Sequence, residues 1–137
     1  MRRLHLIIGL IALDVFVLTG LFMRTHMPPM ITLSSDVRLM YRSRHIYLLA
    51  AALLNVLLGV YLTVCPPGWR RSLQQLGSVL FMIAPVLVLF AFVSEPDHGF
   101  LGISWRSYYG VIALFAGSIA HLLSAGTQGR SGVPASK

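Results

Sequence analysis

Methionine and histidine side chains, which are soft metal ligands, gather in one short stretch of the sequence. The stretch "MRTHMPPM" contains Met23, His26, Met27 and Met30. Thioether sulfur and imidazole nitrogen suit Cu(I), so these residues predict a copper site. A plainer interpretation stays open, because methionine is also a flexible apolar filler and the prolines at 28 and 29 would end a helix. The spacing follows no fixed metal-binding motif.

A second candidate centre rests on two histidines. Haem b held between membrane helices needs two histidines that lie at one depth and face each other. His5 and His121 are both expected on the same side of the membrane. The alternative for His121 is a hydrogen bond to Tyr61 or to a hydroxyl group on the third helix. The sequence leaves the cofactor unknown, with copper and haem b as the two candidates.

Two polar residues interrupt otherwise apolar runs. Asp14 comes ten positions after Leu4, where the first run begins, and Asn55 ten positions after His45, where the second begins. In antiparallel neighbouring helices, both would lie near the middle of the bilayer. A buried carboxylate is costly there, and acids in membrane helices often mark proton or ion pathways. We expect Asp14 and Asn55 to form an intramembrane polar pair, which is either structural or part of a proton-coupled transporter.

A helix count of four with an acid in the middle of the first helix resembles the small multidrug-resistance transporters. The resemblance is confined to these two features. The acid of that family is a glutamate and its loops are tighter, whereas this chain has a long first outer connection. The resemblance implies proton-coupled export of a small cation, with Asp14 as the proton carrier and two copies forming the path.

Basic residues mark the expected outer side of the protein. They predict a docking surface for an anionic group or partner, or else contacts with lipid phosphates and interfacial salt bridges. The residues are Arg38, Arg42, Arg44, His45 and Arg106.

Composition and hydropathy determine the elements that must position these residues. The chain has 137 residues, of which 56% are hydrophobic and 11% charged, against about 25% charged in soluble domains. Its apolar residues form four blocks near the roughly 20 residues that a helix needs to cross a bilayer. The fold class is therefore all-α, a polytopic membrane protein with a four-transmembrane-helix bundle. We predict one domain over 1–127, with helices at about 4–23, 36–65, 73–94 and 106–126, and a disordered tail over 128–137.

The distribution of charge predicts where the protein lies and how it is oriented. The formal charge of +7 comes from basic residues at helix ends, which indicates membrane interfaces and not nucleic acid. The start "MRR" and the short connection "CPPGWRRS" carry arginines on one side. Short loops and the first helix usually set the topology, so we expect both termini in the cytoplasm and the chain in a bacterial inner membrane.

Small residues predict how the helices associate. Gly110, Ala113, Gly117, Ala120 and Ser124 recur every three or four residues. Such a seam packs against protein and not lipid, which describes a compact bundle. Other membrane subunits, or a second copy of the chain, are the expected partners of small-residue helix faces. No hydrolytic motif is present. We expect an accessory or assembly subunit of a larger membrane complex without catalysis of its own; a proton-coupled transporter and a copper or haem redox module are the alternatives.

Overall fold

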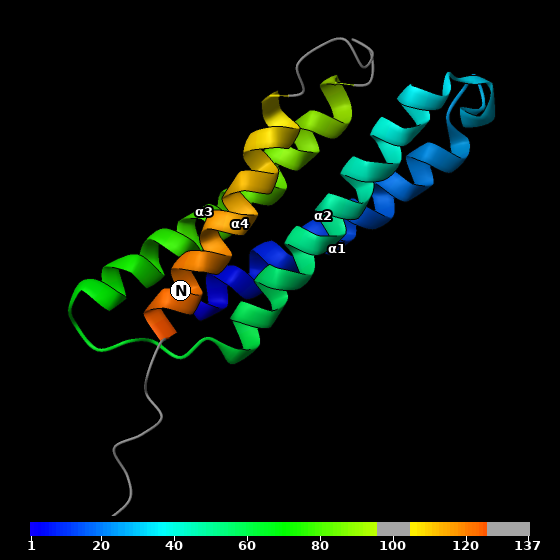
Figure 1. Ribbon diagram of the computed structural model, residues 1–137. Coiled ribbons are helices and arrows are strands. Elements are labelled where there is room, and N and C mark those ends of the chain that lie inside the picture. The colour runs from blue at the N-terminus through cyan, green and yellow to red at the C-terminus, as the bar shows by residue number, and fades with distance from the viewer. Residues whose placement is uncertain (96–104, 126–137) are drawn as a thin grey trace, which may run out of the picture.

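The computed structural model describes residues 1–95 and 105–125, and within them the chain forms four long α-helices. The elements are α1 (Arg2–Thr25), the short 3₁₀ helix η1 (Met30–Thr32), α2 (Ser35–Tyr61), α3 (Trp69–Ser94) and α4 (Trp105–Ala125). Figure 1 shows α1 beside α2 and α3 beside α4, each pair antiparallel. The N-terminus lies near the last turn of α4, and we call this the terminal end of the bundle (Figure 1).

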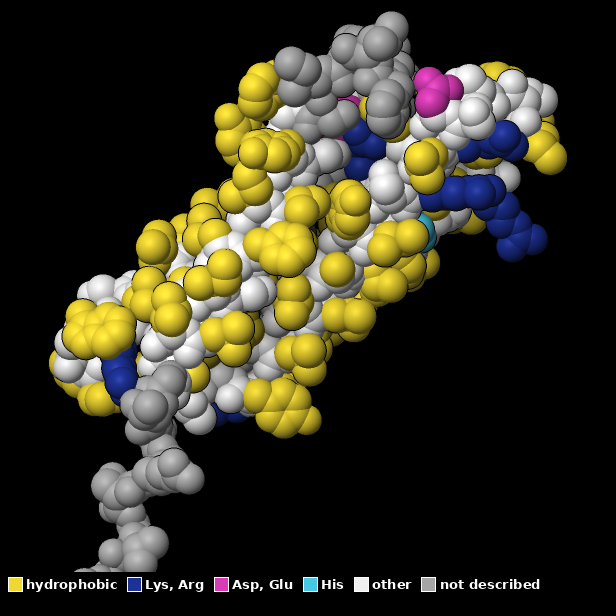
Figure 2. Space-filling view, in the orientation of Figure 1, with side chains coloured by type: hydrophobic (Ala, Val, Ile, Leu, Met, Phe, Trp, Pro, Cys, Tyr) yellow, Lys and Arg dark blue, Asp and Glu magenta, His cyan; other side chains and the backbone are white. Residues whose placement is uncertain are grey.

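The helices have the length and composition of membrane spans. They contain 24, 27, 26 and 21 residues, and each includes a window apolar enough to cross a bilayer. Figure 2 shows apolar side chains along the visible face of the bundle, with arginine nearer its ends. These observations confirm an all-helical chain with four candidate spans, the architecture of an integral membrane protein. The predicted side of the termini and the type of membrane stay predictions.

The connection between α2 and α3 differs from the expected one. We predicted that the second helix extends to residue 65 and the third begins at 73, but α2 ends at Tyr61 and α3 begins at Trp69. The side chain of Gln74 holds the intervening segment, donating to the carbonyl of Thr63 and accepting from the backbone N–H of Cys65. Proline disfavours helical geometry in the residue before it. Cys65 precedes Pro66, so α2 does not continue through Cys65.

Glycines bring the helices of each pair into close contact. A Cβ atom at Gly9 would lie 2.7 Å from the backbone nitrogen of Val56, and one at Gly59 would lie 2.7 Å from Leu6 backbone atoms. At the α3–α4 contact, a Cβ at Gly77 would lie 3.0 Å from the carbonyl of Gly117. Close backbone approach of this kind is how membrane helices associate where no water drives them together.

The small-residue face of α4 packs within the chain. All five residues of the predicted seam are buried. Gly110 contacts Val88, and Gly117 contacts Phe81, both on α3. This face therefore meets protein and not lipid, as expected for a compact bundle, and its neighbour is α3. Association with other subunits or with a second copy stays a prediction. The tail predicted over 128–137 lies outside the described residues.

Candidate functional site

A buried hydrogen-bond network joins three helices at the terminal end of the bundle. His5 of α1 and Asn55 of α2 are both 0% exposed. The Nδ1 atom of His5 lies 2.8 Å from the Oδ1 atom of Asn55. The Nδ2 atom of Asn55 donates to the carbonyls of Ala51, at 2.9 Å, and of Phe81 on α3, at 2.8 Å. Asn55 therefore uses its donor group and its acceptor group at once.

The bond to Phe81 satisfies a carbonyl that α3 itself cannot satisfy. In a regular helix, the carbonyl of Phe81 would accept from the N–H four residues later, but that residue is Pro85, which has no N–H. Backbone groups in lipid must find a partner inside the protein. Asn55 supplies the missing donor from α2. This asparagine therefore stabilises the interior of a proline-containing membrane helix.

The same network fixes the tautomer of His5. Because Asn55 directs its NH₂ group at two carbonyls, its Oδ1 atom accepts from His5, and Nδ1 of His5 carries the proton. Nε2 of the neutral ring then has a bare lone pair. This atom is buried and has no hydrogen-bond partner among the described residues. An unsatisfied buried polar atom costs about 1–3 kcal/mol, which makes Nε2 the principal unexplained atom of the site.

His121 of α4 approaches His5 from the opposite helix pair. The two ring centres lie 6.5 Å apart, with 69° between the ring planes. The hydroxyl of Ser78 on α3 lies 3.4 Å from Nε2 of His121, a long contact. The expected hydrogen bond to a third-helix hydroxyl is thus present. The structure also brings together the two histidines that were singled out as haem ligands.

A cavity of about 630 Å³ opens beside His121. Its wall includes leucines of α2 together with Phe81, and its polar groups include Cys65, Arg70 and Gln74. This size and lining are typical of pockets that hold a small molecule or cofactor. His121 lines this cavity, whereas His5 is buried behind it and does not.

The expected contact between Asp14 and Asn55 is not formed. Asn55 points at His5 and Phe81 instead, and Asp14 is exposed on the outer face of α1. The buried stripe of α1 consists of His5, Gly9, Ala12 and Thr19. Asp14 lies on the opposite side of the helix from this stripe, because successive residues are rotated by about 100°. The spacing of these small and polar residues is the sequence signal that would have placed His5, and not Asp14, against α2.

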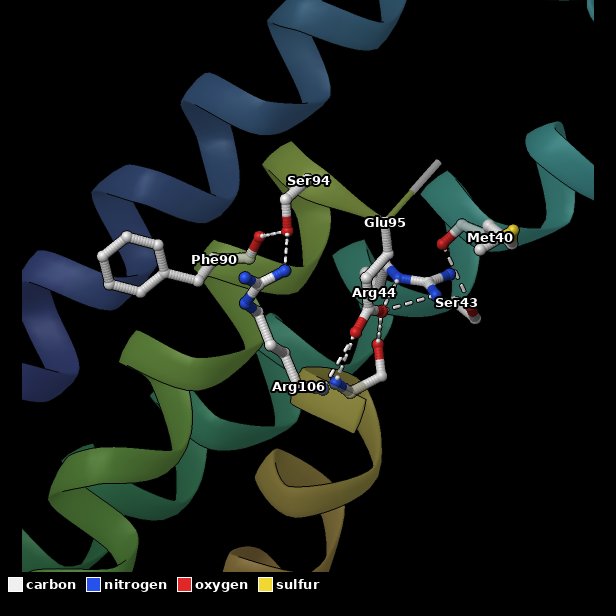
Figure 3. Close-up of polar contacts among 8 residues, drawn as sticks. Met40, Ser43, Arg44, Phe90, Ser94, Glu95 and Arg106 are labelled. Atoms are coloured by element: carbon white, nitrogen blue, oxygen red, sulfur yellow. Dashed lines mark hydrogen bonds and ion pairs between the residues drawn. The ribbon is translucent and has the colours of Figure 1, made fainter. Parts of the chain in front are cut away.

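A second polar network lies at the opposite end of the bundle and centres on Glu95 (Figure 3). Arg44 of α2 donates to Oε2 of Glu95 from Nε, at 2.8 Å, and from Nη2, at 2.6 Å. The Ser107 hydroxyl donates to the same oxygen at 2.6 Å. The backbone N–H groups of Arg106 and Ser107 donate to Oε1 at 2.9 and 3.1 Å. This carboxylate joins α2 and α3 and caps the start of α4, where the helix dipole favours negative charge.

The hydrogen bonds keep Glu95 ionised. Burial by itself raises the pKa of Glu95, but hydrogen bonds from Ser107 and Arg44 and the charge of Arg44 together hold that pKa below its ordinary value. Sequence reasoning did not single out this residue. Glu95 follows α3 directly, and sequence spacing alone does not indicate which helix an interfacial acid will contact.

The residues predicted to form a docking surface lie in different environments and do not form one surface. Arg44 is 3% exposed and paired with Glu95, so it is unavailable on the surface, a correction to its expected role. His45 contacts α1, where its Nδ1 atom lies 2.9 Å from the Thr19 hydroxyl and its ring stacks on Phe16. Arg106 donates from Nη1 to the Ser94 hydroxyl at 2.8 Å. The alternative of an interfacial salt bridge describes Arg44 better than a docking surface does, and the Arg106 side chain is held by the Ser94 hydroxyl.

Two of the arginines predicted for docking and two of the methionines predicted for copper line a smaller cavity. Met23, Met30, Arg38 and Arg42 line about 370 Å³ near the α1–α2 connection. Met27 is 83% exposed, and Nδ1 of His26 donates to the carbonyl of Pro28 at 2.8 Å. The four predicted copper ligands therefore do not all line this cavity. Docking of an anion at Arg38 and Arg42 and binding of copper both stay predictions.

Comparisons of the chain with protein-family models, with curated proteins and with solved structures give no match.

Proposed function

We propose that this protein is an accessory or assembly subunit of a larger membrane complex and has no catalytic activity of its own. The observation that supports this most directly is the position of Asp14. It lies midway along α1, on an outer face where Leu10, Ile11, Val17 and Leu18 are all exposed. Asp14 forms no hydrogen bond or ion pair with any residue in the described part of the chain.

A carboxyl group in that position calls for a partner from outside the chain. In hydrocarbon, an acid is tolerated where it pairs with another polar group or faces a wet cavity. Because the exposed residues beside Asp14 are apolar, this face favours contact with another membrane helix over a wet cavity. We propose that this helix belongs to another subunit and carries a basic side chain at the same depth, because charge complementarity offsets the cost of burying a carboxylate.

The experiment is native mass spectrometry of the tagged chain released gently from its own membranes. Wild-type protein should carry further membrane subunits. With the Asp14→Leu variant, the recovered amount of these subunits should fall by roughly tenfold or more. Truncating one partner of a buried charge pair costs at least about 2 kcal/mol. Val17→Leu, on the same exposed face, is the matched control and should keep them. Recovery of wild type as a bare monomer or homodimer would overturn the proposal.

A proton-coupled transporter is the second candidate, and the outward position of Asp14 also bears on it. Because Asp14 does not point into the bundle, a proton path would have to run between two copies of the chain. Asp14→Asn keeps the shape of the side chain but cannot carry a proton between two charge states. It should abolish proton-coupled transport in reconstituted vesicles. If the variant transports normally, this candidate is lost.

A further inference from the structure

Three arginines from two helices line the cavity at the connection between α1 and α2. Arg24 lies in the last turn of α1, and Arg38 and Arg42 lie in the first two turns of α2. Residues four apart on a helix project from the same side, so the side chains of Arg38 and Arg42 are neighbours. Figure 2 shows basic side chains at this end of the α1–α2 pair. Three positive charges therefore surround a cavity of about 370 Å³.

The chain does not neutralise these charges within its described part. No ion pair joins the three arginines to a carboxylate among the described residues. Asp36 is rotated by about 200° from Arg38 around α2 and does not line the cavity. Like charges four residues apart destabilise a helix, and Arg38 is half-buried, where water and salt screen its charge less. An anion bound between the three guanidinium groups would remove this repulsion.

A phosphate monoester is the anion that suits this arrangement. Each guanidinium group is a planar fork that donates two hydrogen bonds to one oxyanion. A phosphate monoester has three terminal oxygens and a charge of about −1.5 to −2 near neutral pH. A phosphate diester or a carboxylate has fewer terminal oxygens and a smaller charge. Three forks that approach from two helices therefore match the monoester in both oxygens and charge.

The rest of the cavity wall indicates that the phosphate belongs to a lipid. Met23 of α1 and Met30 and Ile31 of η1 complete the apolar part of the wall. Ile31 is 78% exposed, although its side chain is strongly apolar. Arginines at the ends of membrane helices lie at the level of the lipid headgroups. A lipid whose phosphate binds the arginines would place its glycerol and first methylene groups against these apolar side chains.

The same charges bear on the copper site predicted from the methionines. A Cu(I) ion in this cavity would gain the thioethers of Met23 and Met30, but it would be repelled by three positive charges. No acid is among the described residues that line the cavity. The charge of the cavity therefore favours an anion over a metal cation.

We propose that this cavity binds one membrane lipid through a terminal phosphate monoester, with Arg24, Arg38 and Arg42 as the ligands of the phosphate. The proposal goes beyond the role of accessory subunit and does not depend on it. Asp14 lies midway along α1, whereas the cavity lies at the end of that helix, so the two sites can be tested separately.

The test is native mass spectrometry of the full-length chain in a mild detergent, titrated separately with three lipids that have the same acyl chains. Phosphatidic acid is a phosphate monoester, phosphatidylglycerol is an anionic diester, and phosphatidylcholine is a zwitterionic diester. Wild type should retain one molecule of phosphatidic acid, with a dissociation constant at least roughly tenfold lower than for either diester. Equal affinity for phosphatidic acid and phosphatidylglycerol would overturn the proposal.

Arg38→Gln removes one ligand of the phosphate and should weaken binding of phosphatidic acid by roughly tenfold or more. Arg71→Gln is the matched control, because it removes an exposed arginine in the first turn of α3, away from the cavity. It should bind phosphatidic acid as wild type does. Equal losses of affinity in the two variants would show that the lipid is attracted by overall charge, which contradicts a site at this cavity.

Further measurements separate loss of the ligand from loss of the fold and lipid from soluble phosphate. Circular dichroism of Arg38→Gln should show wild-type helicity, and Arg38→Lys should recover part of the affinity because it restores the charge. An Arg38→Lys variant with no recovered affinity would contradict binding by charge at this position. Inorganic phosphate at the same concentration should not displace the lipid. Displacement by inorganic phosphate would identify a soluble ligand and overturn the lipid proposal, and displacement by Cu(I) would overturn it in favour of copper.

Discussion

Asn55 of α2 donates a 2.8 Å hydrogen bond to the carbonyl of Phe81 on α3, which Pro85 deprives of its usual helical donor. The two residues join the α1–α2 pair to the α3–α4 pair. A proline within a membrane helix is tolerated where a neighbouring group satisfies the freed carbonyl, and here an amide side chain does so.

Asn55→Leu should therefore destabilise the fold by about 1–3 kcal/mol, because it leaves the Phe81 carbonyl and the Nδ1 proton of His5 without partners. Pro85→Ala in the same background should recover part of this loss, since alanine at that position restores an N–H for Phe81. The free energies of unfolding of both single variants and of the double variant, measured by detergent titration in mixed micelles, form the test. Strict additivity of the two substitutions would contradict this explanation.

Breaking the buried ion pair between Arg44 and Glu95 should lower the free energy of unfolding more than Asn55→Leu does. Their side chains are 4% and 7% exposed, so removing one partner leaves a buried charge unpaired. Arg44→Met should lower the free energy of unfolding by about 3–5 kcal/mol. Arg42→Met, two positions earlier on the exposed face, is the control and should change it by less than about 0.5 kcal/mol. Equal effects of the two substitutions would show that the pair is not buried in the membrane-embedded protein.

Glu95 also gives the stability a dependence on pH. The folded state lowers the pKa of Glu95 below its ordinary value of 4.5, so unfolded chains bind the proton more readily. The stabilisation is therefore present above the ordinary pKa and is lost as pH falls through the lower, folded pKa. Melting temperatures taken from about pH 7 to about pH 3 should fall more steeply for wild type than for Glu95→Gln. Parallel curves would refute the assignment.

Close packing at Gly59 makes a further prediction. A methyl group there would lie 2.7 Å from backbone atoms of Leu6, which cannot rotate away, so Gly59→Ala should force α1 and α2 apart. We expect a loss of about 1–3 kcal/mol in unfolding free energy. At Gly20, the nearest atoms belong to the His45 ring, at 3.2 Å. That ring can shift, and alanine gains about 1 kcal/mol of helix propensity, so Gly20→Ala should be much milder. A Gly59→Ala variant as stable as wild type would argue against this contact.

The sequence by itself determined four helices that are long and apolar enough to cross a membrane, because apolar runs of that length have few other stable forms where backbone groups find no water. It also singled out His5, His121 and Asn55 as polar residues with a role inside the bundle. It predicted the wrong partner for Asn55, because hydropathy does not indicate how a helix is rotated about its axis.

Only the tertiary structure decided that rotation. Gly9 and Gly59 let α1 and α2 approach closely along one face, which turns His5 inward and Asp14 outward. The same packing brings Glu95 to Arg44, 51 positions away in sequence. Contacts of this kind depend on the shape of whole helix faces, where a glycine at one position sets which side chain meets its neighbour several turns away.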